Sequence, residues 1–163
     1  METTRTILSK PTNADFGDVL DLQTNEQVRQ HLGGPVKVEE FGEKFKGMIA
    51  VKPPESYLVV HHKENGAFIG LVCIAKYHDH IHYEVSHELH PRFWGKGYGT
   101  EIIKTTVDYG LQTLGLEELY AEAQKANLAS VKLLEKTGFE FVSQIERYGE
   151  KQVVYRITST HRE

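Results

Sequence analysis

The sequence predicts one domain built on a mixed α/β sheet with helices on both faces. Segments with the two-residue alternation of strands are interleaved with segments of helical period. Their order is a strand, two or three helices, three strands, a helix, a strand, a helix and two strands, which is typical of such a layered sheet. At 163 residues the chain suits one domain better than two, so we expect residues 1–163 to form a single unit.

The first part of the chain is expected to supply one strand and the helices of one face. A short strand is predicted at 5–8, and Thr12 and Asp15 have the spacing of a capping box at the start of a helix. A helical turn at 28–32 and a longer helix at 38–49 follow. These two segments are ended by Gly33-Gly34-Pro35 and Pro53-Pro54.

A hairpin is predicted next. Two strand-like segments, 57–62 and 67–77, are joined through Asn65-Gly66, a strong hairpin signal. The second segment is apolar on both faces, so we expect it in the middle of the sheet. Strict alternation groups Phe68, Val72 and Ile74 on one face and Ile69, Leu71 and Cys73 on the other. Cys73 is therefore expected to fill the core rather than act as a nucleophile.

Composition and the amino terminus restrict the class of protein. A single cysteine permits no internal disulfide, and the first residues lack the apolar stretch of a signal peptide. No apolar run approaches the roughly 20 residues of a membrane span. A formal charge of −4 disfavours nucleic acid as a partner. We therefore expect a cytoplasmic protein that binds neither nucleic acid nor membranes.

The segment 80–89 alternates differently from the hairpin strands. Its odd positions are largely apolar, whereas its even positions are all polar: His80, His82, Glu84, Ser86 and Glu88. Such a strand lies either at a sheet edge or in the interior with one face toward a wet cleft. Because it leads directly into a glycine-rich loop, we favour the cleft.

The loop has the sequence Trp94-Gly95-Lys96-Gly97-Tyr98-Gly99-Thr100 and precedes a helical pattern at 102–114. A glycine-rich turn between a strand and a helix exposes backbone N–H groups at the positive end of a helix dipole, which suits a phosphate or pyrophosphate. Taken alone, the loop is equally compatible with an ordinary connector.

The remaining segments complete the order. Gly115 is a natural end for the helix, and a short strand is expected at 119–123. Asn127 is placed as the N-cap of a further helix, with Ser130 three residues on. Its apolar face would be Leu128, Val131 and Leu134, and Gly138 would end it. Two final strands are predicted at 139–145 and 152–157, around a turn that contains Gly149.

This order resembles the GNAT superfamily of acetyl-CoA-dependent N-acetyltransferases. The segment 94–100 is similar to the family's pyrophosphate loop, Q/R-x-x-G-x-G/A. The segment from Asn127-Leu128-Ala129-Ser130 to Leu134-Glu135-Lys136-Thr137-Gly138-Phe139 is similar to its second motif, N-x-x-S followed by L-E-K-x-G-F. The resemblance covers nearly the whole chain. It implies a mostly antiparallel mixed sheet that splays open between the fourth and fifth strands.

Three details of the match stand out. Trp94 occupies the first loop position, although Arg92, Gly95 and Gly97 also satisfy the pattern; we prefer the later register because the helix should start at the last glycine. Leu134 stands where many members have a tyrosine proposed as a general acid. The Trp-Gly-Lys-Gly-Tyr run and the L-E-K-x-G-F ending resemble the branch of ribosomal-protein N-terminal acetyltransferases.

The resemblance implies a set of coenzyme contacts. The pyrophosphate of acetyl-CoA would rest on the loop, chiefly on the backbone from Lys96 to Thr100. The pantetheine arm would pair like an extra strand with the backbone of His87, Glu88 and Leu89, and an N–H near Leu89 would bind the thioester oxygen. Asn127 and Ser130 would face the arm and the thiol. Trp94 would either anchor the loop, which we favour, or cover the coenzyme.

The resemblance also implies direct attack by a primary amine while both substrates are bound. Glu84 is the candidate general base, acting through a water molecule, and the alternative is that it only binds a substrate cation or is a solvated residue of the sheet. Ser130 is the candidate to protonate the thiolate, since Leu134 cannot; the alternative is binding and capping without proton transfer. Loss of catalysis would instead leave a GNAT-fold coenzyme-binding sensor or interaction module.

The acceptor and the assembly stay open at this point. A protein N-terminus, a polyamine and a small-molecule amine are all compatible with the residues, and a homodimer is left open. His78, His80 and His82 alternate, which a metal site can use, but strands also place polar residues this way. We therefore expect no metal.

Overall fold

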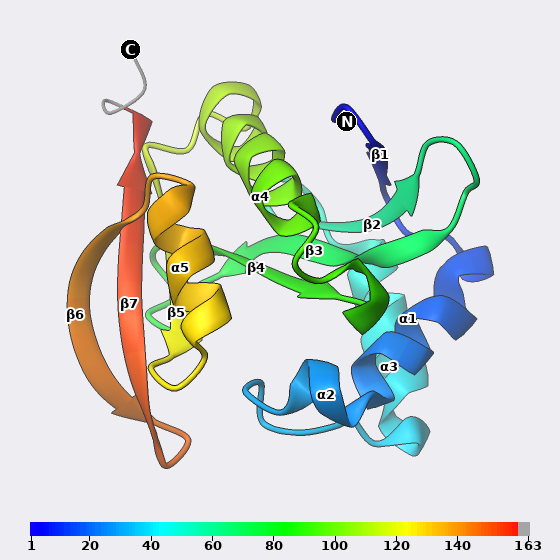
Figure 1. Cartoon of the computed structure of the whole chain (residues 1–163), viewed down its shortest axis with the longest axis horizontal. Helices are drawn as coiled ribbons and strands as arrows, with labels where there is room; N and C mark the ends of the chain where they lie inside the picture. The colour runs from blue at the N-terminus through cyan, green and yellow to red at the C-terminus, as the bar shows by residue number, and fades with distance from the viewer. Residues whose placement is uncertain (160–163) are drawn as a thin grey trace.

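The computed structural model describes residues 1–159, which form a seven-stranded sheet with helices on both faces (Figure 1). The strands are β1 (Thr6–Ser9), β2 (Ser56–His62), β3 (Phe68–Lys76), β4 (Tyr83–Leu89), β5 (Glu118–Gln124), β6 (Glu140–Arg147) and β7 (Glu150–Thr158). The α-helices are α1 (Phe16–Thr24), α2 (Glu26–Arg29), α3 (Val38–Ala50), α4 (Tyr98–Asp108) and α5 (Leu128–Lys136). The predicted fold class and element order are confirmed.

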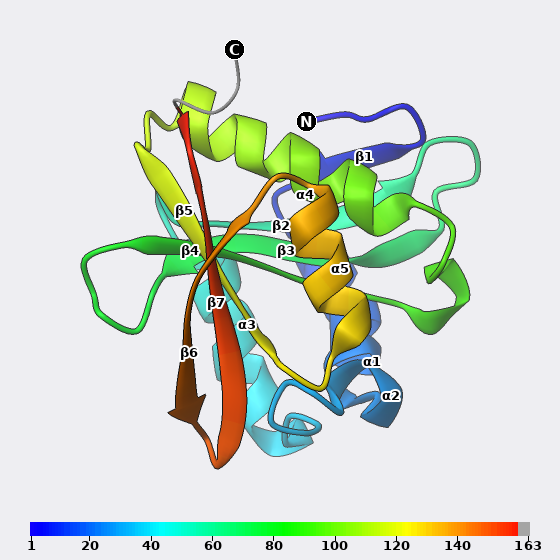
Figure 2. The same ribbon diagram turned by 60° about the vertical axis from the view of Figure 1, so that its left-hand side comes forward.

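The sheet is opened between β4 and β5. The spatial order is β1-β2-β3-β4-β5-β7-β6, and every neighbouring pair is antiparallel except β4 with β5. These two parallel strands share a single backbone pair, Glu84 with Tyr120, near their starts. In Figure 2 β2 to β4 run across the view while β6 and β7 run down it, so the halves of the sheet diverge. The predicted splay is confirmed.

Two hydrophobic cores hold the layers together. One joins the sheet to α4 and α5, and its fully buried members include Val72, Ile74, Ile102, Ile103 and Leu119. The other joins the sheet to α1 and α3, and its members include Val19, Leu22, Phe41, Phe45 and Leu71. Strand β3 contributes to both cores, as expected of a central strand. No helix in the part of the chain that the structure describes is long and apolar enough to cross a membrane.

A bulge in β3 corrects the grouping expected from strict alternation. Val60 of β2 pairs with Gly70 and His61 pairs with Phe68, so Ile69 is an extra residue. Ile69 therefore packs with Val72 and Ile74, whereas Phe68 joins Leu71 on the opposite face.

The lone cysteine lies in this strand. Cys73 is buried, and burial raises its pKa to about 11. The thiol therefore stays protonated at neutral pH, which agrees with the expected core position.

Two predicted boundaries were wrong. Strand β4 begins at Tyr83 rather than at His80, because His80 adopts a left-handed turn with φ of 59° and the carbonyl of His82 accepts from Tyr77 N–H. Helix α4 begins at Tyr98 with Gly97 as its N-cap, so it does not start at Gly99. The helix start therefore does not support the preferred loop register.

Gly99 was expected to start the helix, but its role is to let two helices pack closely. It lies in the first turn of α4, where an added Cβ would stand 3.1 Å from Leu133 Cδ2. Glycine at this position allows α4 to lie close to α5. The α-helical part of α4 ends at Asp108, and a π-helical turn, Tyr109–Thr113, leads to Gly115.

Gly70→Ala tests how closely β3 and β4 approach. An added Cβ would lie 2.2 Å from the carbonyl oxygen of Glu88, so β4 has to move. We expect the free energy of unfolding to fall by about 1–3 kcal/mol in chemical denaturation. Gly47→Ala in α3 is the control: no atom lies within 4 Å of its added Cβ, and removing a helical glycine should stabilise by about 0.5–1 kcal/mol. Equal effects of the two substitutions would contradict the proposed crowding.

Candidate active site

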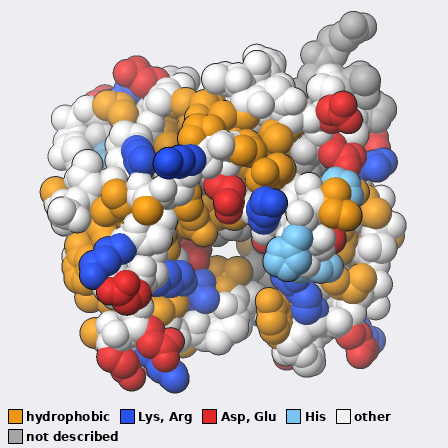
Figure 3. All heavy atoms as spheres, turned by 180° about the vertical axis from the view of Figure 1, so that it is seen from behind, with side chains coloured by type: hydrophobic (Ala, Val, Ile, Leu, Met, Phe, Trp, Pro, Cys, Tyr) orange, Lys and Arg blue, Asp and Glu red, His pale blue; other side chains and the backbone are white. Residues whose placement is uncertain are grey.

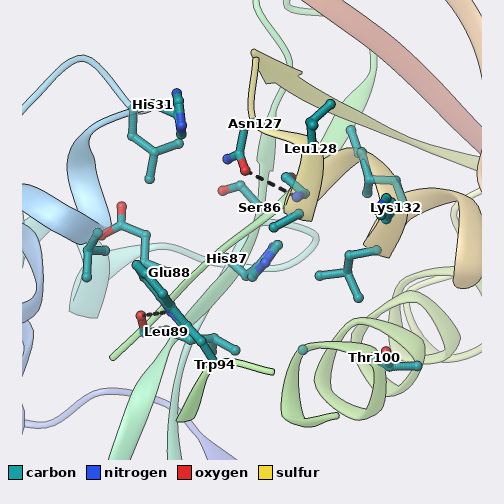
Figure 4. A pocket seen from close by; sticks show the side chains of 18 of the residues that line it. His31, Ser86, His87, Glu88, Leu89, Trp94, Thr100, Asn127, Leu128 and Lys132 are labelled. Atoms are coloured by element: carbon teal, nitrogen blue, oxygen red, sulfur yellow. Dashed lines mark hydrogen bonds between the residues drawn. The ribbon is translucent and has the colours of Figure 1, made fainter. Parts of the chain in front are cut away.

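The opening between β4 and β5 forms a cavity with a volume of about 630 Å³. Strand β4 lies at its centre. The loop before α4, the start of α5 and the end of β5 form one wall, and α2 with the residues after it forms the other. Figure 4 shows His31 and Glu88 on one side of the opening, across from Lys132 and Thr100.

Most of the sequence-predicted coenzyme residues line this cavity. They are His87, Glu88, Leu89, Trp94, Gly95, Gly97, Gly99, Thr100, Asn127 and Ser130. Three predicted site residues do not line it: Glu84, Lys96 and Tyr98. The Lys96 ammonium donates to the carbonyl of Arg92 at 2.8 Å, and the Tyr98 ring is buried beneath Arg5. A coenzyme role for Lys96 and Tyr98 therefore rests on their backbone alone.

The loop before α4 has the geometry of an anion site. Gly95 and Gly97 adopt left-handed conformations, with φ of 69° and 84°, that other residues rarely adopt. The helix bond closest to the loop runs from Glu101 N–H to the carbonyl of Gly97. The N–H groups of Tyr98, Gly99 and Thr100 therefore have no acceptor within the helix and lie at its positive end.

Trp94 is fixed to the end of β4. Its Nε1–H donates to the carbonyl of Leu89 at 2.8 Å, and the indole remains 44% exposed along the cavity wall. This bond supports the expected anchoring role. The N–H of His90 donates to Ile69 in β3. Because successive residues of a strand direct their N–H groups to opposite sides, the N–H of Leu89 points away from β3 and toward the opening.

The open edge of β4 also carries an imidazole that the sequence reasoning used only for its backbone. His87 lies on the same face as Val85 and Leu89, and its side chain projects into the cavity between β4 and α5 (Figure 4). Loss of hydration lowers its pKa to about 4. The ring is therefore neutral at pH 7 and offers one N–H donor and one acceptor.

Glu84 lies on the opposite face of β4, at its single pairing with β5. Burial raises its pKa to about 7, the negative charge of Glu122 adds to this shift, and Arg147 opposes it. Glu122 itself is occupied: its carboxylate lies 3.1 Å from Arg147 Nε and accepts from the Tyr77 hydroxyl at 2.9 Å. Among residues 1–159, no group forms a hydrogen bond or ion pair with the side-chain carboxylate of Glu84.

Glu84 does not itself line the large cavity, although Ser86, two residues along the same face, and Glu122 both do. The molecule is hollowed at the middle of its rear face, where acidic, basic and histidine side chains gather beside a hydrophobic area (Figure 3). Glu84 is therefore next to residues of the opening without lining it.

A buried polar cluster continues along the same face of β4. Glu88 Oε1 accepts from Arg29 at 2.6 Å and from Gln23 at 3.3 Å. Glu88 Oε2 and Gln23 Oε1 are buried without a hydrogen-bond partner. Both residues line a second cavity of about 120 Å³, which shares Ser86, His87 and Glu88 with the large one.

The cluster also fixes the far wall of the large cavity. Arg29 donates to the carbonyls of Leu32 and Gly34, and His31 Nδ1 lies 3.1 Å from Gln124 Oε1 at the end of β5. The residues after α2 are thus tied to both diverging strands. The sequence did not predict these contacts, because Arg29 and Glu88 are 59 positions apart and His31 and Gln124 are 93 positions apart.

The start of α5 has the expected capping geometry. Asn127 Oδ1 accepts from the N–H of Ser130 at 3.2 Å, which confirms Asn127 as the N-cap (Figure 4). Ser130 lines the cavity, and no described residue bonds to its hydroxyl. Leu134 is buried at the cavity wall, so it provides no proton donor there.

The three alternating histidines have separate surroundings. His82 Nδ1 lies 2.5 Å from Asp79 and its Nε2 lies 3.2 Å from Glu118, whereas His78 lies 3.8 Å from Glu122. Over residues 1–159, no three His, Cys, Asp or Glu side chains are arranged to hold a metal ion. The His82 contacts instead tie the β3–β4 turn to the start of β5.

Comparison with known proteins identifies the family. A family model described as the acetyltransferase (GNAT) domain matches residues 5–140. The chain belongs to the GNAT family of N-acetyltransferases. It is 26% identical over 162 residues to the uncharacterised N-acetyltransferase YoaA of Bacillus subtilis (strain 168), covering 91% of this chain and 86% of that one.

Solved structures confirm the GNAT fold. An acetyltransferase from Bacillus anthracis superposes with a TM-score of 0.85 at 20% identity, covering 97% of both chains. The spermidine N-acetyltransferase from Vibrio cholerae, solved in complex with CoA and spermine, superposes with a TM-score of 0.82 at 21% identity, covering 95% of this chain and 96% of that one.

Glu84→Gln tests the environment of this carboxyl group through stability. The raised pKa means that the folded state holds the proton more tightly than the unfolded chain, so Glu84 lowers stability as pH rises from about 4.5 toward about 7. We expect the Tm of the variant minus that of the parent protein to increase between pH 5 and pH 8. Thermal unfolding at several pH values measures this difference, and a difference that stays flat or falls would show that the carboxyl is not buried beside Glu122.

Proposed function

We propose that this protein transfers an acetyl group from acetyl-CoA to a primary amine by direct attack in a ternary complex, with Glu84 as the general base. The observation that carries the proposal is a partly buried carboxylate without a partner, beside the opening that exposes the edge of β4. The family relationship supports acetyl transfer. The resemblance of the glycine loop and of the α5 start to the GNAT motifs supports acetyl-CoA as the donor.

The residues around the opening fit the coenzyme in two places. The unpaired N–H groups at the start of α4 suit its pyrophosphate, and the left-handed glycines leave the backbone accessible. The edge of β4 beyond Glu84 has no strand beside it, so the backbone of His87 and Leu89 is available to an extended pantetheine arm. The Leu89 N–H points toward the opening, where it would stabilise the oxyanion that develops on the thioester.

The amine must lose a proton before it attacks. An alkyl amine has a pKa of about 10.4 and an α-amine has one of about 7.7–8.0, so both are largely protonated at pH 7. A base whose pKa lies near the working pH transfers protons most effectively. Glu84, with a pKa raised to about 7, meets this condition and is free of competing partners. We propose that it receives the proton through a water molecule.

The thiolate that leaves needs a hydrogen-bond donor. Ser130 and the neutral His87 both line the cavity and carry a group that can donate, whereas Leu134 carries none. We propose that Ser130 fills this role, since its hydroxyl is free while Asn127 caps the helix.

Glu84→Gln tests the general base. It should lower kcat/KM for the best amine by about 10²–10⁴-fold, the usual contribution of such a residue. The parent protein's kcat/KM should rise with pH through about 7, and the variant should lose this rise. Thiol release from acetyl-CoA, followed with a thiol reagent, measures both. A loss of less than about tenfold would refute the role of Glu84. If no amine caused the parent protein to release thiol, the result would indicate a coenzyme-binding sensor instead.

For the acceptor, we propose the α-amine of a peptide or protein chain. The second cavity adjoins the reacting end of the first and offers both kinds of hydrogen-bonding group. Gln23 Oε1 and Glu88 Oε2 are unpaired acceptors. The Lys44 ammonium and the Tyr57 hydroxyl are donors without a hydrogen bond to any described residue.

A peptide group matches the donors and acceptors of the second cavity, because it presents both an N–H and a carbonyl. A polyamine presents donors and positive charges only, and these would meet the Lys44 ammonium. At about 120 Å³ the cavity has room for roughly four water molecules, which is close to the size of one peptide group. The resemblance to ribosomal-protein N-terminal acetyltransferases supports the same acceptor.

Substrate selectivity tests this acceptor class. We expect kcat/KM for a dipeptide amide with a free α-amine to exceed that for 1,4-diaminobutane. Lys44→Met should lower the ratio of the two values by about threefold to tenfold, as for the loss of one hydrogen bond. Lys46→Met is the matched control, because Lys46 is exposed and pairs only with Glu43. A preference for the diamine would refute the peptide acceptor and leave acetyl transfer intact.

A further inference from the structure

The amino-terminal strand reaches across the fold to the glycine loop. Arg5, just before β1, donates from Nη1 to the carbonyl of Lys96 at 3.0 Å, and its guanidinium lies 3.9 Å from the centre of the Tyr98 ring. Its Nε and Nη2 each lie 2.9 Å from Glu101 Oε2 in the first turn of α4. One side chain thus contacts the loop, the first helical residue and the first helical turn, about 90 positions away in sequence.

The contact with Lys96 determines where the next N–H points. In a trans peptide the carbonyl of one residue and the N–H of the next point in opposite directions. Because the Lys96 carbonyl is turned toward Arg5, the N–H of Gly97 is turned away from it. Gly97 lines the large cavity, whereas Lys96 does not. Arg5 therefore holds this peptide with its donor on the cavity side.

Little else restrains this peptide. Gly95 and Gly97 both have left-handed backbones, and glycine has more accessible conformations than any other residue. An added Cβ at Gly95 would meet no atom within 4 Å, so its surroundings are open. The nearest atom to a Cβ at Gly97 would be Arg5 Nη2, at 3.4 Å. Without Arg5 the loop would have to be ordered when a ligand binds, which costs affinity.

Arg5 also compensates a charge that opposes anion binding. Glu101 lies in the first turn of α4, where a carboxylate competes with an anion for the helix terminus. Hydrogen bonds from Thr3 and Arg5, together with the Arg5 charge, hold the pKa of Glu101 below its ordinary value, so it is ionised at neutral pH. The guanidinium cancels this charge while leaving the helix N–H groups free.

We propose that Arg5 is a positioning residue for the coenzyme: it holds the loop peptide and neutralises Glu101, so that the start of α4 is ready for the pyrophosphate. This inference rests on the proposed function, which makes acetyl-CoA the ligand. Arg5 acts through the loop and touches neither reacting group.

The test compares acetyl-CoA with acetyl-pantetheine, which has the same thioester and no pyrophosphate. In the parent protein kcat/KM should be higher for acetyl-CoA. Arg5→Met retains an apolar stem over Tyr98 and removes the guanidinium. We expect it to reduce the advantage of acetyl-CoA over acetyl-pantetheine by about tenfold or more, mainly through the KM for acetyl-CoA. Arg5→Lys, which restores the charge but not the fork of donors, should recover part of the loss.

Lys63→Met is the matched control, because Lys63 pairs with Glu2 of the same amino-terminal segment without contacting the loop. It should keep the parent ratio. The positioning role would be overturned if Arg5→Met left the ratio of kcat/KM for acetyl-CoA to that for acetyl-pantetheine unchanged, including by lowering both values equally. If the methionine variant does not fold, the ratio in Arg5→Lys decides. No turnover or binding of acetyl-CoA by the parent protein would instead overturn the proposed function.

Discussion

The single backbone pair between β4 and β5 is the constraint on which the rest of the molecule depends. If the two strands stayed paired along their length, the sheet would be closed and β4 would have no free edge. Because pairing stops after Glu84 and Tyr120, the strands diverge and the large cavity forms between them. Side chains replace the missing backbone bonds at the junction: His82 bridges Asp79 to Glu118, and the Tyr77 and Tyr120 rings stack at 5.3 Å. A stable junction and an open cleft therefore occur on the same pair of strands.

The two faces of β4 carry residues with different proposed roles in the site. His87 and Leu89 lie on the side of α4 and α5, beside the glycine loop and Ser130. Glu84, Ser86 and Glu88 lie on the side of α1 and α3, near the second cavity. Strand geometry alone produces this division, since successive side chains point to opposite faces. In the proposed reaction the two substrates approach the strand from different sides and meet at its edge.

The sequence predicted the features that depend on near neighbours. The Asn127 cap, the glycine loop and the alternation of β4 involve residues a few positions apart, and local geometry decides them. Prediction from the sequence failed where a single residue changes the strand. The bulge at Ile69 moves Ile69 and Phe68 to the faces opposite those expected, and the turn at His80 shortens β4. It also missed Arg5 with Glu101 and Arg29 with Glu88, because such pairs are brought together only by the folded sheet. Charged residues in helices and strand ends are too common for their partners to be read from one sequence.

The bond from Trp94 to Leu89 has a consequence beyond anchoring the loop. An exposed strand edge is a template for any extended chain, and proteins usually cover or interrupt such edges to avoid association. Here the indole N–H already occupies the Leu89 carbonyl, so that acceptor is withheld from an incoming strand. The free edge is limited to a few residues between Glu84 and Leu89, bounded at one end by β5 and at the other by Trp94. A short, narrow ligand can pair there, whereas a strand from another protein molecule would be excluded.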